Sequence, residues 1–131
     1  MSVLRPDNRP EEIVAAYLRE LEIHLEAVRK GEAEYMFEIR DFAELLHIHP
    51  RHLSNTIREV LHCSPCDIFE KRLMEIAKDM IANSDDSIAS IARHLTFDPS
   101  NFNKFFKRFE GVTPNQYRVW VKNSEAITTL V

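Results

Sequence analysis

Apolar residues recur every three or four positions along most of this chain, which is the spacing of helices that bury one face. Helices are predicted from Glu11 to about Lys30, Arg40 to Leu46, Pro50 to about Leu61, Pro65 to about Ala82, Ile88 to Leu95, Pro99 to Phe109, and Thr113 to about Lys122. The first carries an apolar stripe at Ile13, Val14, Tyr17, Leu18, Leu21, Leu25 and Val28. No segment alternates long enough to indicate a sheet, so the expected fold class is all-α.

One stretch of the sequence occurs twice. Residues 39–68 reappear without a gap, shifted by 49 positions, as residues 88–117. The matches fall on apolar, turn and cap positions, as at Ala43 and Ala92 or Pro50 and Pro99. The residues between these matches differ. This pattern predicts one supersecondary scaffold that is used twice with different surface side chains.

Each copy contains a short predicted helix, a tight turn and a second amphipathic helix. This order is typical of a helix-turn-helix, whose second helix can lie in the major groove of DNA. In the second copy an apolar stripe is predicted to face inward, at Phe102, Phe105, Phe106 and Phe109. Polar residues fall on the opposite face, at Ser100, Asn103, Lys104 and Lys107, and the equivalent places in the first copy hold Arg51, Ser54, Asn55 and Arg58. Such side chains can bond base edges or phosphates, which makes both faces candidates for DNA contact.

The distribution of charge supports this interpretation more than the total does. A net charge of −4 and a pI near 5.9 argue mildly against a nucleic-acid partner. Residues 1–38, however, hold five basic and nine acidic side chains, whereas residues 93–122 hold six basic and two acidic ones. The alternative is that both outward faces are ordinary solvated helix surfaces. A duplicated core alone would not need a positive bias on both of them.

The residues of the second copy also resemble a known family. Ser87-Ile88-Ala89-Ser90-Ile91-Ala92, followed by Leu95, Phe97, Ser100, Phe102, Phe106-Lys107-Arg108, Gly111, Thr113-Pro114 and Tyr117-Arg118, is similar to the signature of the AraC/XylS family of bacterial transcription regulators. The resemblance covers residues 39–121. It implies two helix-turn-helix lobes joined by a long central helix, here with an extra N-terminal helix.

This similarity also implies boundaries and contacts. Residues 1–38 are expected to form a lead-in and an acidic amphipathic helix, residues 39–123 the AraC-type DNA-binding domain, and residues 124–131 a C-terminal tail. Within the domain, the first lobe would cover residues 39–63, the connecting helix 64–83 and the second lobe 84–123. Both recognition helices would enter successive major-groove segments. The candidate DNA-binding residues are Arg51, Ser54, Asn55, Arg58, Ser100, Asn101, Asn103, Lys104, Lys107 and Arg108.

Three positions depart from the family pattern. Thr96 stands where the family usually has glycine, and a β-branched residue there is costly if the backbone is left-handed. His62 replaces the usual glycine after the first recognition helix. The turn before Pro99 is one residue shorter than usual, which predicts that Asp98 caps the helix directly. These departures affect the exact base contacts more than the fold.

Two other clusters suggest different chemistry. Cys63 and Cys66 form a Cys-x-x-Cys, which elsewhere marks a redox pair or half of a zinc site, but the chain has no second pair. Four histidines crowd one region without a strong ligand spacing, and if they face DNA, binding should tighten as the pH falls. These histidines are His47, His49, His52 and His62.

Metal sites, cofactors and catalysis are not expected, since the chain lacks a glycine-rich phosphate loop and a nucleophile elbow. The main rival function is a protein-interaction module derived from the helix-turn-helix scaffold. A thiol or metal sensor acting through Cys63 and Cys66 is less favoured.

The acidic first helix affects the choice of partners. Its apolar stripe is expected to complete the core of the first lobe, while its acidic face and the long connection after it offer a surface to another molecule. The expected partners are double-stranded DNA, RNA polymerase and, as a further option, a second copy bound through this helix. The N-terminus lacks the apolar core of a signal peptide and no uncharged apolar run could span a bilayer. We therefore expect a cytoplasmic protein without membrane contact.

Overall fold

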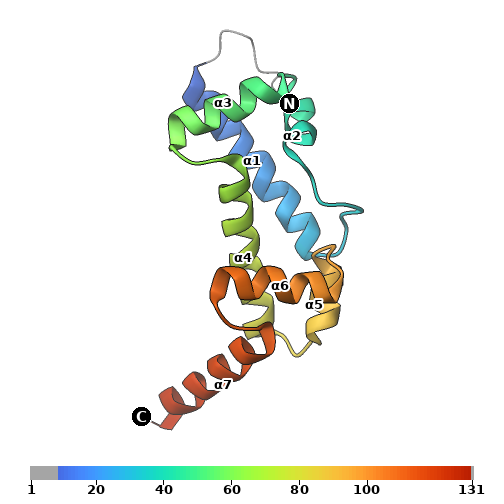
Figure 1. The fold of residues 1–131 in the computed structure, drawn as a ribbon, viewed down its shortest axis with the longest axis vertical. Helices are drawn as coiled ribbons and strands as arrows, with labels where there is room; N and C mark the ends of the chain where they lie inside the picture. Colours follow the sequence, from blue (N-terminus) through green and yellow to red (C-terminus); the bar gives the residue numbers. More distant parts are fainter. Residues whose placement is uncertain (1–8, 131) are drawn as a thin grey trace. The chain divides into compact units, whose positions relative to one another are not determined.

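The computed structural model describes residues 9–130, with side chains up to Glu125. Over this range it contains seven helices and no strand, which confirms the expected all-α class (Figure 1). The predicted irregular lead-in falls mostly on residues 1–8, outside the described range. None of the helices described is long and apolar enough to cross a membrane. The helices are α1 (Pro10–Arg29), α2 (Ile39–Leu46), α3 (Pro50–Leu61), α4 (Pro65–Asn83), α5 (Ile88–His94), α6 (Pro99–Glu110) and α7 (Pro114–Leu130).

The chain divides into two compact units. The first extends to Arg72 and the second begins at Leu73, so the boundary lies within α4. The first unit holds the helix-turn-helix of α2 and α3, and the second holds that of α5 and α6. The arrangement confirms the expectation of two lobes joined by a long helix.

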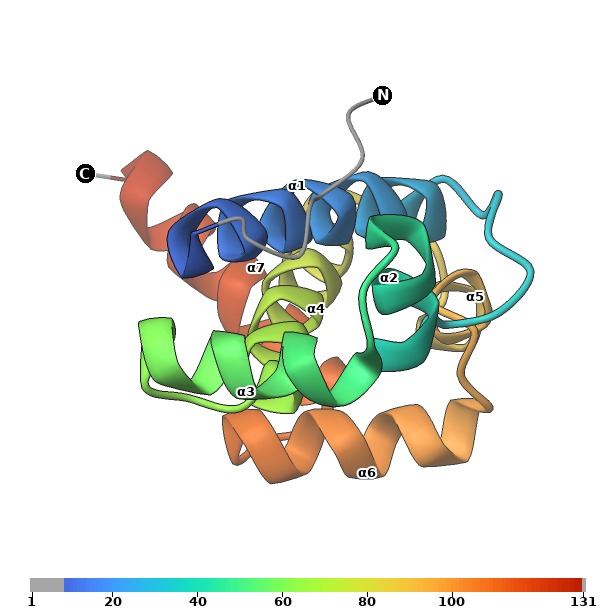
Figure 2. The ribbon, with the colours of Figure 1, turned by 90° about the horizontal axis from the view of Figure 1, so that it is seen from above.

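The first unit is built around the apolar stripe of α1. This helix packs against both α2 and α3, and Figure 2 shows α2 lying crosswise beside it. The rings of Tyr17 and Phe42 meet edge to face, with centroids 5.3 Å apart, and both side chains are only 1% exposed. Leu53 and Ile57 of α3 are fully buried in the same unit. The stripe therefore completes the first lobe's core, as expected, although Leu18 is only half-buried.

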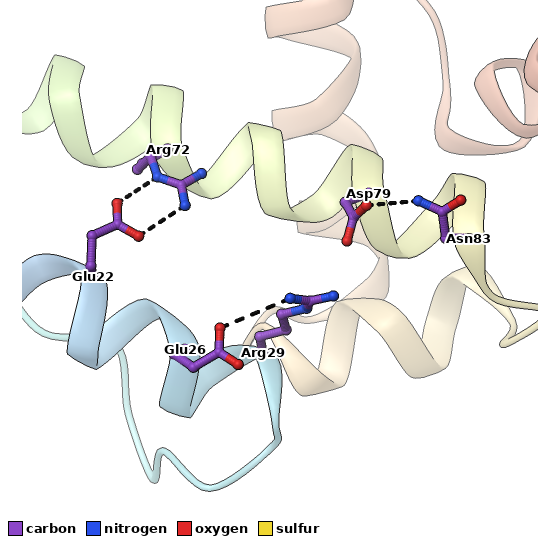
Figure 3. A network of polar contacts seen from close by, with 6 residues as sticks. All are labelled: Glu22, Glu26, Arg29, Arg72, Asp79 and Asn83. Carbon is purple, nitrogen blue, oxygen red and sulfur yellow. Dashed lines mark hydrogen bonds and ion pairs between the residues drawn. The ribbon is translucent and has the colours of Figure 1, made fainter.

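A side-chain ion pair also fastens α1 to the first part of α4. Figure 3 shows Glu22 of α1 facing Arg72 of α4, and both guanidinium Nε and Nη2 donate to the carboxylate, the second over 2.8 Å. Such a two-point contact fixes orientation as well as distance. Arg72 and Glu22 keep 35% and 50% of their side-chain surface exposed, so this pair orients the helix more than it stabilises the fold.

The core of the second unit is aromatic. Phe102 and Phe106 of α6 are fully buried, and Phe106 lies 5.7 Å from Tyr117 of α7, measured between ring centroids. Arg118 of α7 donates from Nε to the carbonyl oxygen of Ile81 over 3.1 Å and from Nη2 to that of Ser84 over 3.3 Å. These carbonyls lie at and just beyond the C-terminal end of α4. Arg118 therefore satisfies acceptors that a helix end leaves unpaired.

Two predictions about the second unit need correction. Phe109 was expected in the inward stripe but is 42% exposed, because it lies in the last turn of α6, where its ring meets Phe105 at a tilt with centroids 5.0 Å apart. The last helix was expected to end near Lys122 and continues to Leu130. Residues 123–130 contain no glycine or proline to end it. Residues 124–130, expected as a tail, are therefore helical.

Candidate nucleic-acid interface

The two recognition helices, α3 and α6, begin in the same way. Each has proline at its first position and a capping side chain just before it. The Nδ1 atom of His49 accepts the backbone N–H of Arg51 over 3.1 Å, and the Oδ2 atom of Asp98 accepts that of Ser100 over 3.2 Å. The prediction that Asp98 caps α6 directly is confirmed. His49 and Asp98 are 49 positions apart, so the repeat extends to the caps.

The turn before each recognition helix has a left-handed residue. His47 has φ 59° and Thr96 has φ 64°. In each turn, the amide of the next residue donates a hydrogen bond to a carbonyl five residues earlier, in the preceding helix. These bonds join Ile48 N–H to Ala43 over 3.0 Å and Phe97 N–H to Ala92 over 2.8 Å. This pattern is a common way to end a helix with a sharp change of direction. It fixes the direction in which each recognition helix leaves the turn.

The exits from the recognition helices also correspond. His62 with φ 57° follows α3, and Gly111 with φ 79° follows α6. Beyond them, reciprocal side-chain caps open the next helix: Ser64 with Asp67 at the start of α4 and Thr113 with Gln116 at the start of α7. The amides of Asp67 and Gln116 donate to the cap hydroxyls over 3.1 Å and 3.2 Å. Turn, helix and exit are thus built from equivalent positions in both copies.

The outward face of α3 carries the four residues predicted from the first copy. Arg51, Asn55 and Arg58 are exposed, while Ser54 is half-buried. The spacing of three, four and seven residues from Arg51 places all four along one side of the helix. This side lies opposite Leu53 and Ile57, which anchor α3 in the core.

The face of α6 is longer and more basic. All six predicted residues on it are exposed, and no acidic residue lies between Pro99 and Phe109. Arg108 lies over the rings of Phe105 and Phe109, with its guanidinium carbon 6.0 and 5.4 Å from their centroids. These contacts place Arg108 at the edge of the face. The six residues are Ser100, Asn101, Asn103, Lys104, Lys107 and Arg108.

The repeat identifies two exposed positions on α3 that the sequence prediction left out. His52 corresponds to Asn101 and Glu59 corresponds to Arg108, each at a distance of 49 positions. They lie two helical turns apart on one flank of the face. The sequence already contained this signal, because subtracting 49 from each candidate position on α6 also gives His52 and Glu59. The flanks differ in charge, which makes the two faces less alike than their centres suggest.

The cysteines and histidines do not form a recognisable metal centre. Cys63 is half-buried, Cys66 is exposed at the start of α4, and neither forms a disulfide. Within the described residues, no group of three or more His, Cys, Asp or Glu side chains is placed to hold a metal ion.

Cys66 also acts on a buried tyrosine of α1. Burial raises the pKa of Tyr17 to about 12, and the negative charge of an ionised Cys66 adds to the rise.

A family model described as a helix-turn-helix domain matches residues 42–119. Among curated proteins, the chain is 32% identical over 81 residues to YisR of Bacillus subtilis, called an uncharacterised HTH-type transcriptional regulator. It is 31% identical over 81 residues to RafR of Pediococcus pentosaceus, the raffinose operon transcriptional regulatory protein. Each match covers 61% of this chain, but the chain spans only 28% and 29% of these relatives.

Solved structures share the fold. The C-terminal domain of AraT, a response regulator from Geobacillus stearothermophilus, is 27% identical with a TM-score of 0.66, over 79% of this chain and 83% of that one. The AraC-type regulator from Chromobacterium violaceum is 15% identical with a TM-score of 0.70, over 85% of this chain and 93% of that one. The DNA-binding domain of AdpA, solved with a target DNA, is 19% identical with a TM-score of 0.68, over 90% and 96%. With a family model matching more than half of its length and two helix-turn-helix lobes of this architecture, the chain belongs to the AraC-type helix-turn-helix family.

Proposed function

We propose that this chain is the sequence-specific DNA-binding part of a transcription regulator and that α3 and α6 enter successive major-groove segments. The observation that carries the proposal is the pair of recognition helices. Their turns, caps and exits lie at equivalent residues 49 positions apart, while their outward side chains differ. The names of YisR and RafR as transcriptional regulators support it. The proposed place of action is the cytoplasm.

In this proposal the two faces divide the work of recognition. Arg51 can give two hydrogen bonds to guanine, and Asn55 and Asn103 can each bond adenine at two atoms. Arg58, Lys107 and Arg108 neutralise phosphates and set the position of the helices along the duplex. The remaining candidates add base or phosphate contacts, at Ser54, Ser100, Asn101 and Lys104.

Because the faces differ, one copy of the chain is expected to read an asymmetric site. The first face is centred on Arg51, Asn55 and Arg58, whereas the second has Ser100, Lys104 and Lys107 at the same places. A monomer would then bind two unlike half-sites about 34 Å, or one helical turn, apart.

Selection of a preferred sequence from randomised duplexes tests this function. The expected result is a single site with two unlike halves about ten base pairs apart. Arg51→Ala should relax the selected sequence in one half, and Lys104→Ala should relax it in the other. Lys30→Ala, an exposed lysine outside both faces, is the control and should leave the selected site unchanged.

The rival function is a protein-interaction module, which the overall negative charge favours. Binding to random duplex DNA at low and moderate salt separates the two. Phosphate contacts release counterions, so affinity should fall steeply as salt rises. The absence of binding at both salt concentrations would favour the protein-interaction module.

RNA polymerase is proposed as the protein partner, bound through the outward face of α1. With the apolar stripe buried, this face presents Glu11 and Glu12 and an isoleucine, Ile23, that is 58% exposed. A partner surface with basic residues around an apolar spot would be complementary. A second copy bound through this helix is less favoured, because two acidic faces would repel each other.

Both partner proposals can be tested with Ile23→Glu. If RNA polymerase binds here, the variant should lose binding to the purified polymerase while DNA affinity stays the same. If a second copy binds instead, sedimentation of the wild-type chain should show a dimer that the variant loses.

A further inference from the structure

His24 is a buried histidine with a defined hydrogen bond outside both recognition faces. Its side chain is 5% exposed, although it lies in the stripe of α1 that packs the first lobe. The Nε2 atom accepts the backbone N–H of Phe37 over 3.0 Å. The two rings are stacked, with centroids 3.9 Å apart and planes 10° apart. An Nε2 acceptor requires the neutral imidazole with its proton on Nδ1.

The surroundings of His24 disfavour its charged form. Phe42 of α2 meets the ring edge-on with centroids 5.8 Å apart, and the ring of Phe69 of α4 lies 6.4 Å away, so both of these contacts are apolar. Asp41, in the first turn of α2, brings a carboxylate whose negative charge favours protonation of the imidazole. Burial has the larger effect, and it lowers the pKa of His24.

The hydrogen bond holds the chain where it enters the first helix-turn-helix. Directly after Phe37, the amide of Glu38 donates to Oδ2 of Asp41 over 2.8 Å and opens α2. Phe37 also meets Phe42, the buried ring of α2, with centroids 5.4 Å apart. The amides of Gly31 and Glu32 already donate to carbonyls at the end of α1, and His24 fastens the rest of the connection, residues 33–38, to α1 before α2 begins.

We propose that His24 is a positioning residue for the first helix-turn-helix and that its protonation releases residues 33–38, which weakens DNA binding through the first lobe in acid. Protonation places a hydrogen on Nε2, so the imidazolium can only donate and faces the amide N–H of Phe37 donor to donor. The hydrogen bond is lost and the stacked pair must separate. This inference rests on the proposed function for its effect on DNA, but the release of the segment does not.

The pH effect proposed for His24 is opposite in direction to the one that the sequence predicts for the exposed histidines. His49, His52 and His62 on or beside α3 are exposed. For the histidines near α3, the sequence predicts tighter DNA binding in acid if they face DNA. His24 acts the other way, so the two effects separate when His24 alone is replaced.

The test uses the full chain without DNA first. Amide hydrogen exchange is followed between about pH 5 and 8, and the imidazole of His24 is titrated by NMR over the same range. We compare exchange after correction for the intrinsic rate. As the pH falls from the ordinary histidine pKa to the lowered pKa of His24, protection of the Phe37 amide should fall roughly tenfold per pH unit. His24→Gln supplies an amide oxygen that does not titrate, so its protection should stay flat. His94→Gln, an exposed histidine of α5, is the control and should behave as the wild type.

The second part of the test measures DNA affinity of the same three proteins. On acidification, the dissociation constant of the wild type should rise relative to that of His24→Gln. The factor of this rise should not exceed the factor by which protection of the Phe37 amide falls. If His24→Gln does not fold, His24→Phe keeps the stacked ring without the acceptor and should show low, pH-independent protection of Phe37. Protection of Phe37 that persists while His24 titrates would overturn the inference. Segment release without DNA binding by any of the proteins would instead contradict the proposed function.

Discussion

His47 and Thr96, which are 49 positions apart, both adopt the left-handed backbone conformation, with φ 59° and 64°. Neither residue is glycine, and this region costs an L-amino acid about 1–2 kcal/mol. The β-branched Thr96 is the less suited of the two. The turn geometry is therefore imposed by what surrounds it, including the bonds from Ile48 and Phe97 back to the preceding helix. The same backbone conformation at equivalent positions shows that both copies need the same turn.

Thr96→Gly should stabilise the second lobe. Glycine adopts φ 64° without strain, and the gain should be about 0.5–1 kcal/mol after the larger entropy of glycine in the unfolded chain is subtracted. Thr96→Ala removes the β-branch but keeps the left-handed strain, so it should gain less. Chemical denaturation of the three proteins measures the difference. A loss of stability in Thr96→Gly would show that the threonine side chain makes a compensating contact.

Lys104→Ala should weaken DNA binding at the selected site by about 1–3 kcal/mol if the lysine contacts a base. It projects from the exposed face of α6, away from the buried phenylalanines. Titration of selected and random duplexes gives the two affinities. Equal losses on both would make Lys104 a phosphate anchor, and no loss on either would remove it from the interface. Lys30→Ala provides a matched change of charge just after α1.

Arg118→Ala should destabilise the second unit by about 1–3 kcal/mol, because two carbonyl groups lose a charged donor. Both bonds, to Ile81 and Ser84, are partly buried, so water replaces them only in part. Thermal unfolding measures the loss. Arg118→Lys can restore one bond but not the planar pair and should fall in between. A lysine variant as stable as the wild type would show that one donor is enough.

Stability should also fall in alkali because of Tyr17. Its pKa is raised to about 12 in the folded chain, while an unfolded tyrosine titrates near 10. Between these values the unfolded chain releases the proton first, so folding is penalised by up to about 2–3 kcal/mol as the pH rises, with no effect well below pH 10. Tyr17→Phe should remove this alkaline decline. Denaturant unfolding at a series of pH values compares the two proteins, and identical declines would contradict the assignment.

Much of the architecture could be predicted because it depends on local signals. Helical periodicity placed all seven helices, and the Ser64 and Thr113 caps marked the starts of two of them. The predicted end of α7 was wrong for two reasons. A helix without glycine or proline gives no stop signal, and the residues after Lys122 are polar enough to suggest a tail. The prediction that Phe109 is buried was wrong, because periodicity indicates which side of a helix a residue faces but not whether anything covers the last turn.

His24 shows what a pattern of residue types cannot supply. It lies three residues after Leu21, at a position where the stripe continues, but a histidine there is counted as polar in an amphipathic pattern. Its burial depends on Phe37, thirteen residues away, folding back onto α1. The exposed faces of α3 and α6 were easier to predict, since the repeat itself separates scaffold from surface.

The local origin of the caps has an evolutionary consequence. His49 starts α3 and Asp98 starts α6, and each cap bonds only to amides of its own helix. Mutations on one outward face can therefore accumulate without altering how the other helix is held. A lineage could retarget one half of its operator at a time, and a laboratory could recombine halves from different homologues, as long as the buried scaffold is kept intact.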